Sequence, residues 1–431
     1  MKNPSSNPDD DSEANSLRVF KPRRALPTDV VRPTRAEVNL SHLRHNLHLL
    51  RNASPPPTRI WAVVKADAYG HGARAVARTL ERAGVDGICV ALVEEGIELR
   101  EAGITVPILV MGGYYGSTFR EVLHHELTPV LHEAAQIEQL ASTLEQAELP
   151  EASVHIKVDT GMSRLGARPA DWKKLAETLA AHPRVRFQGL MTHFANADLD
   201  ATEVLQEPLH LFEQARRVFA DAGLVPLLRH AANSAALLRG GAAFDVVRPG
   251  IALFGVDPWP AKTSVGLLPS VMEREVLPKL KPVMSVHSRV VAVRELNAGD
   301  AVGYGSSWRA ARTSRIATIP MGYADGLSRA LSNKASLLVR GARAPIVGVV
   351  SMDMTMIDVT DVGDVAVGED VVLLGSQKWP DERAAHKTRS LPGGTRSDCI
   401  TANEIAASSG TIPWEVLTNI SRRVPRFYRE P

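Results

Sequence analysis

The sequence predicts an α/β fold, a (β/α)8 TIM-like barrel followed by a mostly-β C-terminal domain. Eight short apolar runs alternate with segments that have helical apolar spacing. The runs begin near Ile60, Ile88, Val106, Thr128, Val154, Phe187, Leu227 and Val246. Alternation over about 240 residues matches the usual size of such a barrel. An open doubly wound sheet is the alternative, but "KADAYGHG" after the first run is not the Gly-rich fingerprint that such sheets usually carry.

The segments between these runs supply the expected helices. In residues 35–53, "RAEVNLSHLRHNLHLLRNA", apolar residues recur with helical spacing at Leu40, Leu43, Leu47 and Leu50. Residues 70–84, "GHGARAVARTLERAG", end on a glycine that suits a helix C-cap. Further helices are expected at 93–103, 117–126, 133–148, 171–182, 204–223 and 234–241.

After about residue 272 the pattern changes to short β-rich runs separated by Gly, Asp and Asn turns. We therefore expect three parts: a disordered tail at 1–33, the barrel at 34–272 and the β domain at 273–431. The polar, turn-rich segment Ser376–Asp398 is expected to be a surface loop or insertion.

Composition indicates an ordinary globular protein of the cytoplasm. The chain has 431 residues and a formal net charge of +2, which gives no sign of a nucleic-acid or membrane partner. Two cysteines are too few for a disulfide framework, and no apolar run approaches the length of a transmembrane helix. The polar start of the chain lacks the apolar region of a secretory signal. No metal site is predicted.

Polar and charged residues follow five of the eight predicted strands, where a barrel of this kind places its active site. They are Lys65 and Tyr69 after the first strand, Lys157 and Arg164 after the fifth, His193 after the sixth, Asn233 and Ser234 after the seventh, and Arg248, Gly250 and Ile251 after the eighth. These side chains are expected to converge on one face.

The chemistry of this set indicates pyridoxal phosphate. Barrels often bind phosphate with the loops after strands seven and eight, where Ser234 can cap a helix and Gly250 allows close approach. A free ammonium at Lys65 would be costly to bury, and an imine with a carbonyl cofactor removes that cost. Arg248 can meet a ring nitrogen, with His193 to orient it. Alone, Lys65 could equally be a rim lysine; the other loops favour the cofactor.

Nine motifs, in order, resemble the alanine racemase family. They are "AVVKADAYGHG", "KVDTGMSRLG", "MTHFANAD", "AANSAA", "VRPGIALFG", "VGYGSSW", "IPMGYADG", "VSMDM" and "ITANEIA". The resemblance covers about 36–431 and implies a barrel with a C-terminal β domain. It also implies a head-to-tail homodimer, with each active site between one barrel and the partner's β domain, and racemisation of alanine to supply D-alanine for peptidoglycan.

The resemblance also implies residue roles. Lys65 would carry the cofactor and act as base on the D-enantiomer, and Tyr304 would reach from the other subunit as base on the L-enantiomer. Arg164 and the Met352 backbone would hold the substrate carboxylate, and Tyr323 would lie at the mouth of the substrate channel. A base on each face of a planar carbanion is what racemisation requires.

The remaining roles concern the cofactor. Tyr69, Ser234, Gly250 and Ile251 would hold the phosphate, and Arg248 would face the pyridine nitrogen with His193 behind it. An arginine there leaves the nitrogen unprotonated, which weakens the electron sink and disfavours transamination. Lys157 matches a position that is often carbamylated in the family, where the added anion would pair with Arg164.

One departure from the family pattern is Trp414 in "TIPWEVL", where the family normally has a tyrosine that helps to hold the phosphate. A larger indole that only donates predicts a tighter pocket or an altered phosphate contact. Alanine stays the expected substrate, with serine or a broader range as the alternative. A related decarboxylase would need an acidic partner in place of Arg248, and a non-catalytic cofactor carrier would lack the β domain. His71 and His230 are expected to be structural.

Overall fold

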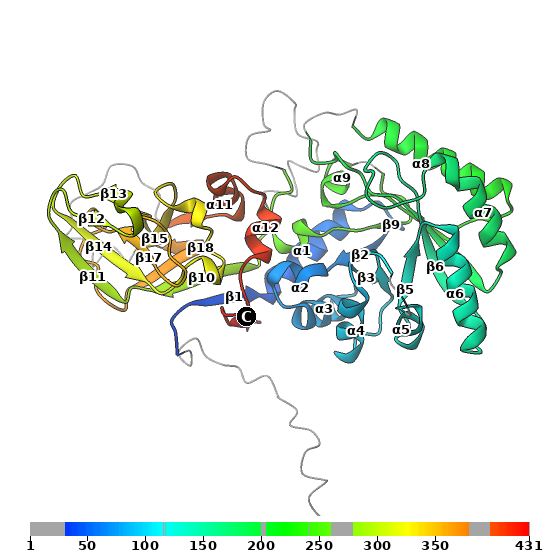
Figure 1. Cartoon of the computed structure of the whole chain (residues 1–431), viewed down its shortest axis with the longest axis horizontal. Helices are drawn as coiled ribbons and strands as arrows, with labels where there is room; N and C mark the ends of the chain where they lie inside the picture. Colours follow the sequence, from blue (N-terminus) through cyan, green and yellow to red (C-terminus); the bar gives the residue numbers. More distant parts are fainter. Residues whose placement is uncertain are drawn as a thin grey trace, which may run out of the picture.

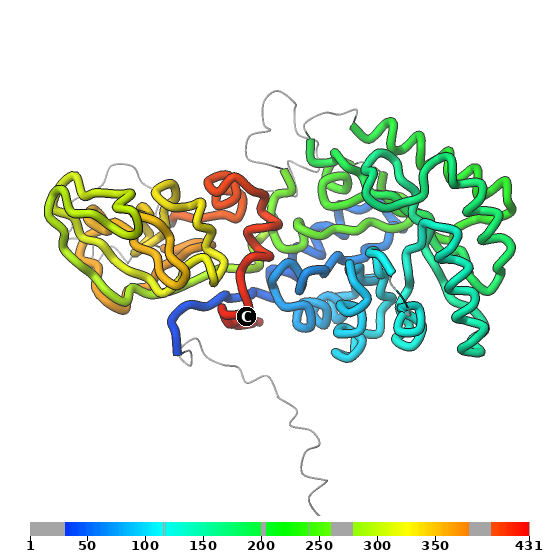
Figure 2. Tube along the Cα trace, in the orientation of Figure 1, coloured from blue at the N-terminus to red at the C-terminus, as the bar shows by residue number. Residues whose placement is uncertain are grey.

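The computed structural model describes residues 31–114, 116, 118–199, 204–240, 242–259, 279–378 and 397–430. Nearly all of the predicted tail, the predicted domain boundary near 272 and most of the predicted insertion at 376–398 lie outside these residues. The described chain forms two bodies side by side, a barrel and a β domain, with the C-terminal segment between them (Figures 1 and 2). Within this part of the chain, no helix is long and apolar enough to cross a membrane.

The barrel is an eight-stranded parallel sheet in the order β8-β7-β6-β5-β4-β3-β2-β9. Its strands are β2 (Arg59–Val63), β3 (Gly87–Val90), β4 (Ile108–Val110), β5 (Thr128–Leu131), β6 (Ala152–Lys157), β7 (Val185–Met191), β8 (Leu228–His230) and β9 (Val246–Val247). Two backbone hydrogen bonds close it between the last strands: Asp245 N to Arg229 O at 3.0 Å and Arg248 N to Ala232 O at 2.9 Å. The predicted barrel is therefore confirmed.

Helices cover the outside of this sheet because each carries one apolar face. In α3, for example, Val76 and Leu80 are buried while Arg74 and Glu81 point outward. The helices are α1 (Leu40–Ala53), α2 (Lys65–Gly70), α3 (Ala73–Arg82), α4 (Val93–Glu101), α5 (Thr118–His124), α6 (Ala134–Gln146), α7 (Trp172–Ala181), α8 (Gln206–Asp221) and α9 (Ser234–Leu238), with 3-10 turns η2 (Pro169–Asp171) and η3 (Ile251–Phe254).

The β domain contains a seven-stranded sheet in the order β16-β15-β18-β10-β1-β20, with β19 beside β18, and smaller sheets β11-β14-β17 and β12-β13. The strands are β1 (Arg35–Asn39), β10 (Met284–Arg289), β11 (Ala292–Leu296), β12 (Ala301–Val302), β13 (Trp308–Arg309), β14 (Ser314–Ile319), β15 (Ser336–Val339), β16 (Ala342–Pro345), β17 (Thr355–Asp358), β18 (Asp370–Lys378), β19 (Ser397–Ile400) and β20 (Arg426–Arg429). Its helical elements are η5 (Tyr304–Ser306), η6 (Tyr323–Asp325), η7 (Arg329–Leu331), α11 (Ala402–Ser409) and α12 (Pro413–Thr418).

One local prediction was wrong, and another needs narrower bounds. Residues 35–39 were expected to begin a helix, but they form β1, which pairs antiparallel with β10 and parallel with β20. The helix begins only at Leu40, because the Asn39 side chain accepts hydrogen bonds from the N–H groups of Ser41 and His42 and caps it. The ends of the expected loop at 376–398 belong to the antiparallel strands β18 and β19, with Gln377 opposite Asp398, and the residues between these strands lie outside the described part of the chain.

Candidate active site

The site begins at the end of β2, where the chain turns sharply after Lys65. In α2 the residues Ala66–Tyr69 have φ of 52° to 53°, so this turn is left-handed. Left-handed helix costs about 1–2 kcal/mol per non-glycine residue, so surrounding contacts must hold it. The turn places Lys65 half-buried at the barrel mouth and Tyr69 in the interior. Burial, with a smaller effect of Arg164, lowers the pKa of the Lys65 amine, which favours its neutral, nucleophilic form.

Hydrogen-bond donors converge beside Tyr69 at the ends of the last two barrel strands. A side-chain Cβ on Gly250 would lie 2.4 Å from Tyr69 Oη, so only glycine allows this approach. Ser234 Oγ accepts hydrogen bonds from Gly250 N at 2.9 Å and Ala252 N at 3.3 Å. Burial raises the pKa of Tyr69, which keeps its hydroxyl a donor. These hydroxyls and backbone N–H groups, with Ile251 buried beside them, fit a phosphate group.

The predicted helix cap needs a correction. Asn233, rather than Ser234, caps α9, because Asn233 Oδ1 accepts from Ala236 N at 3.0 Å. Asn233 therefore orients the first turn of α9. The cap leaves the Ser234 hydroxyl free to face the loop after β9, where the donors gather.

Arg248 is buried, and its guanidinium is held by three groups of the barrel. Its NH1 lies 2.7 Å from His230 Nδ1, and its NH2 donates to Thr192 O at 2.7 Å and Ala231 O at 3.2 Å. Because arginine only donates, His230 Nδ1 must accept, so the proton of this neutral ring sits on Nε2. His230 Nε2 lies 2.7 Å from His155 Nδ1, and His155 Nε2 lies 3.2 Å from Gln188 Oε1.

The hydrogen-bonded partner that orients Arg248 is therefore His230, not His193 as the sequence suggested. A signal for this was present: His230 ends a predicted strand, at the level where inward side chains meet the mouth. His193 lies at the same mouth after β7. Burial, then the charges of Arg248 and its neighbours, lower the pKa of His193 to about 3, so this ring is neutral.

Lys157 and Arg164 complete a cationic mouth. Lys157 ends β6 and is 6% exposed; burial, then Arg164 and Arg248, lower its pKa to about 8. Arg164 is exposed and follows a tight turn in which Asp159 Oδ1 accepts from Gly161 N at 3.0 Å and Met162 N at 2.9 Å. An excess of cations at one mouth favours anionic ligands such as phosphate and carboxylate.

Tyr304, Tyr323 and Met352 lie in the β domain, and one chain does not bring them together with Lys65. Tyr304 follows β12, at the end of the β domain that points away from the barrel (Figure 1). The three side chains are 74%, 43% and 52% exposed. The loops of the last two are joined, since Ala324 N donates to Met352 O at 3.0 Å.

An ion pair between Arg32 and the buried Asp325 supports these loops. Asp325, fully buried, accepts from Arg32 through both carboxylate oxygens at 2.8 and 3.0 Å, and from Gly322 N at 3.1 Å. Arg423 lies 3.3 Å from the same carboxylate and 2.6 Å from Asp353. Asp325 and Asp353 thus hold the loops of Tyr323 and Met352 in place.

Trp414 lies in the first turn of α12, which packs on α2 between the two bodies (Figure 1). Its side chain is half-buried against the main core.

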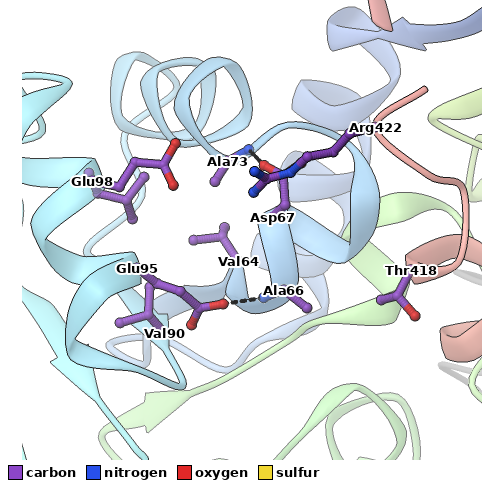
Figure 3. A pocket seen from close by; sticks show the side chains of 10 residues that line it. Val64, Ala66, Asp67, Ala73, Val90, Glu95, Glu98, Thr418 and Arg422 are labelled. Atoms are coloured by element: carbon purple, nitrogen blue, oxygen red, sulfur yellow. Dashed lines mark hydrogen bonds between the residues drawn. The ribbon is translucent and has the colours of Figure 1, made fainter. Parts of the chain in front are cut away.

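A cavity of about 320 Å³ lies next to the left-handed turn. Figure 3 shows the hydrogen bonds of Glu95 to Ala66 and of Asp67 to Ala73, and it shows Arg422 reaching toward Asp67. The described residues hold no cluster of His, Cys, Asp or Glu suited to a metal ion.

Comparisons with known proteins agree with this architecture. The family model for the alanine racemase N-terminal domain matches residues 38–258, and that for the C-terminal domain matches 283–428. The alanine racemase of Sorangium cellulosum is 54% identical over 407 residues, which cover 93% of this chain and all of the relative. This chain belongs to the alanine racemase family. The protein is accordingly an isomerase.

Solved structures of alanine racemases share the fold. That from Bacillus anthracis, with bound L-Ala-P, is 33% identical with a TM-score of 0.80, over 93% of this chain and 96% of its own. That from Bartonella henselae, with covalently bound pyridoxal phosphate, is 30% identical with a TM-score of 0.77, over 92% and 99%.

Proposed function

We propose that the protein interconverts L- and D-alanine with pyridoxal phosphate and two bases. The observation that carries this is the convergence at one barrel mouth of Lys65, the donor cluster around Tyr69, and the buried guanidinium of Arg248. Each matches one part of the cofactor: its carbonyl carbon, its phosphate and its ring nitrogen. Family membership supports the same assignment.

The bound cofactor would supply an electron-withdrawing ring that acidifies the α-proton of an attached amino acid. Arg248 would donate to the ring nitrogen. Burial lowers the pKa of Arg248 to about 10, so it remains a cation near neutral pH and leaves that nitrogen as an acceptor. Tyr69 Oη, Ser234 Oγ and the N–H groups of Gly250 and Ile251 would hold the phosphate.

Two bases on opposite faces would move the α-proton. The Lys65 amine, with its lowered pKa, can accept and return a proton on one face. Tyr304 of the partner subunit would serve the other face, because Tyr304 follows β12, which lies at the end of the β domain away from the barrel of its own chain (Figure 1). Arg164 and the Met352 N–H of the partner subunit would hold the substrate carboxylate.

This assignment requires a homodimer with shared sites, and the exposed Tyr304, Tyr323 and Met352 are the surface that a second copy would cover. A cytoplasmic role in supplying D-alanine for peptidoglycan follows from the family. We also propose that the neutral Lys157 amine adds to CO2 with loss of one proton, since the resulting carbamate would offset the charge of Arg164.

Trp414 favours alanine over larger substrates. Its indole occupies more room than a tyrosine ring at a position beside the lysine turn. The alternative is that the indole alters the phosphate contact without narrowing the pocket, which would allow serine or a broader range of amino acids. Measurement of kcat/KM for each amino acid distinguishes the two.

The test is racemisation of L-alanine, followed by polarimetry, for the wild type and Lys65→Ala. We expect a fall of at least about a thousandfold for Lys65→Ala, because it loses both a base and the covalent anchor. Lys173→Ala is the matched control, since Lys173 is an exposed lysine on α7. Retention of wild-type racemisation by Lys65→Ala would contradict the proposal.

A further inference from the structure

The left-handed turn after Lys65 is held by hydrogen bonds that come from outside it. At its start, Ala66 N donates to Glu95 Oε1 at 2.5 Å. In its middle, His71 Nδ1 lies 2.9 Å from both Ala68 O and Tyr69 O and must donate to them. At its end, Gly70 O accepts from Arg426 Nε at 3.1 Å. The distant side chains of Glu95 and Arg426, together with the adjoining His71, thus fix a conformation that alanine and tyrosine disfavour on their own.

Packing alone does not hold this turn on every side. The cavity of about 320 Å³ borders it toward α4, with Val64, Ala66 and Asp67 in its wall (Figure 3). The C-terminal segment leaves no spare room where it meets the two glycines at the end of the turn. A Cβ on Gly70 would lie 2.5 Å from Leu417 O, and one on Gly72 would lie 1.8 Å from Tyr428 Oη.

Arg426 is the residue that joins this segment to the turn. Its NH1 donates to Ser421 O at 2.5 Å and Val424 O at 2.6 Å, and its NH2 donates to Ile420 O. The planar guanidinium therefore binds the carbonyls of Ile420, Ser421 and Val424 through NH1 and NH2, and it donates to Gly70 O through Nε. A lysine ammonium cannot span this set of acceptors.

We infer that Arg426 is a positioning residue for the cofactor lysine. It fixes Gly70, and through the left-handed turn it sets the separation between Lys65 at one end and Tyr69 at the other. These two residues would hold opposite ends of one rigid cofactor, so a relaxed turn would lose their joint fit. The inference rests on the proposed role of Lys65 and Tyr69 in binding pyridoxal phosphate.

Two measurements on Arg426→Met test the inference. Hydrogen exchange of the apoprotein should become faster in peptides that cover residues 64–73 and stay at wild-type rates in α7 peptides. The Kd for pyridoxal phosphate, followed by visible absorbance, should rise about tenfold or more. Arg426→Lys should fall between the two. Arg429→Met is the matched control, since Arg429 lies on the same strand but pairs with Glu37, and it should retain the wild-type Kd.

Each outcome either supports the inference or overturns it. A wild-type Kd and wild-type exchange in Arg426→Met would overturn the inference, as would faster exchange throughout the chain, which indicates a merely structural role. If Arg426→Met does not fold, Arg426→Lys is subjected to both measurements and judged by the same criteria. If the wild type does not bind pyridoxal phosphate, the proposed function fails, while the exchange measurement still reports whether Arg426 holds the turn.

Discussion

At the scale of single residues, Arg248 sets the protonation of the barrel interior. The guanidinium can only donate, so His230 Nδ1 accepts and the ring proton lies on Nε2. His230 Nε2 therefore donates to His155 Nδ1, and His155 Nε2 donates to Gln188 Oε1. The lone pair of His230 Nδ1 thereby faces Arg248, and the lone pair of His155 Nδ1 faces His230, so the guanidinium has a hydrogen-bond acceptor without a buried carboxylate. A protonated His230 would repel Arg248 instead, and burial lowers the pKa of His230 well below its ordinary value.

The buried neutral histidines predict that the folded protein loses stability in acid. Burial lowers the pKa values of His71 and His155 to about 4, from 6.5. Between pH 6.5 and 4 the unfolded chain binds these protons and the folded chain does not, so the free energy of unfolding falls as pH falls. Each shift corresponds to about 3 kcal/mol. In chemical unfolding at several pH values, His155→Asn should reduce this slope by about one proton.

Gln188→Met is the control for that slope. It removes the hydrogen bond at the outer end of the chain of rings but no titrating group, so stability should fall at every pH while the slope persists. An unchanged slope in His155→Asn would show that this ring is not kept neutral by the fold.

At the scale of elements, α12 carries Trp414 and packs on the left-handed α2, so the proposed substrate preference depends on this contact. Trp414→Tyr should raise kcat/KM for serine relative to alanine by about 3- to 10-fold, because a smaller ring leaves room for one more polar atom. Racemisation of both amino acids, assayed in parallel, measures this ratio. If the ratio is the same in both proteins, Trp414 does not limit the pocket.

Some of these elements could be predicted from the sequence and others could not. The barrel strands follow from apolar runs, and Lys65, Tyr69, Ser234, Gly250 and Arg248 follow from their places at strand ends, which the structure brings to one mouth. The handedness of α2 does not follow, because "KADAY" has ordinary helix formers and only distant groups such as Arg426 impose the left-handed form. Strand β1 was missed for the same reason: its partners, β10 and β20, come from the far end of the chain.

At the scale of the whole molecule, the C-terminal segment contacts both the barrel and the β domain. The C-terminal segment holds the lysine turn of the barrel through Arg426, and through Arg423 it holds the loops of Tyr323 and Met352 in the β domain. In a head-to-tail dimer, those loops would serve the partner's barrel. In the proposed dimer, each chain would contribute half of two sites and would complete neither alone.

Subunit mixing tests this central claim most directly. Lys65→Ala and Tyr304→Phe are each purified, shown to be inactive, and mixed under conditions that exchange subunits. Half of the dimers then pair one variant with the other, and each such dimer has one intact site, so about a quarter of wild-type racemisation should return. Mixing Lys65→Ala with a chain that carries both substitutions should restore none. If the first mixture stays inactive although exchange is complete, Lys65 and Tyr304 do not act across the dimer, and the account is wrong.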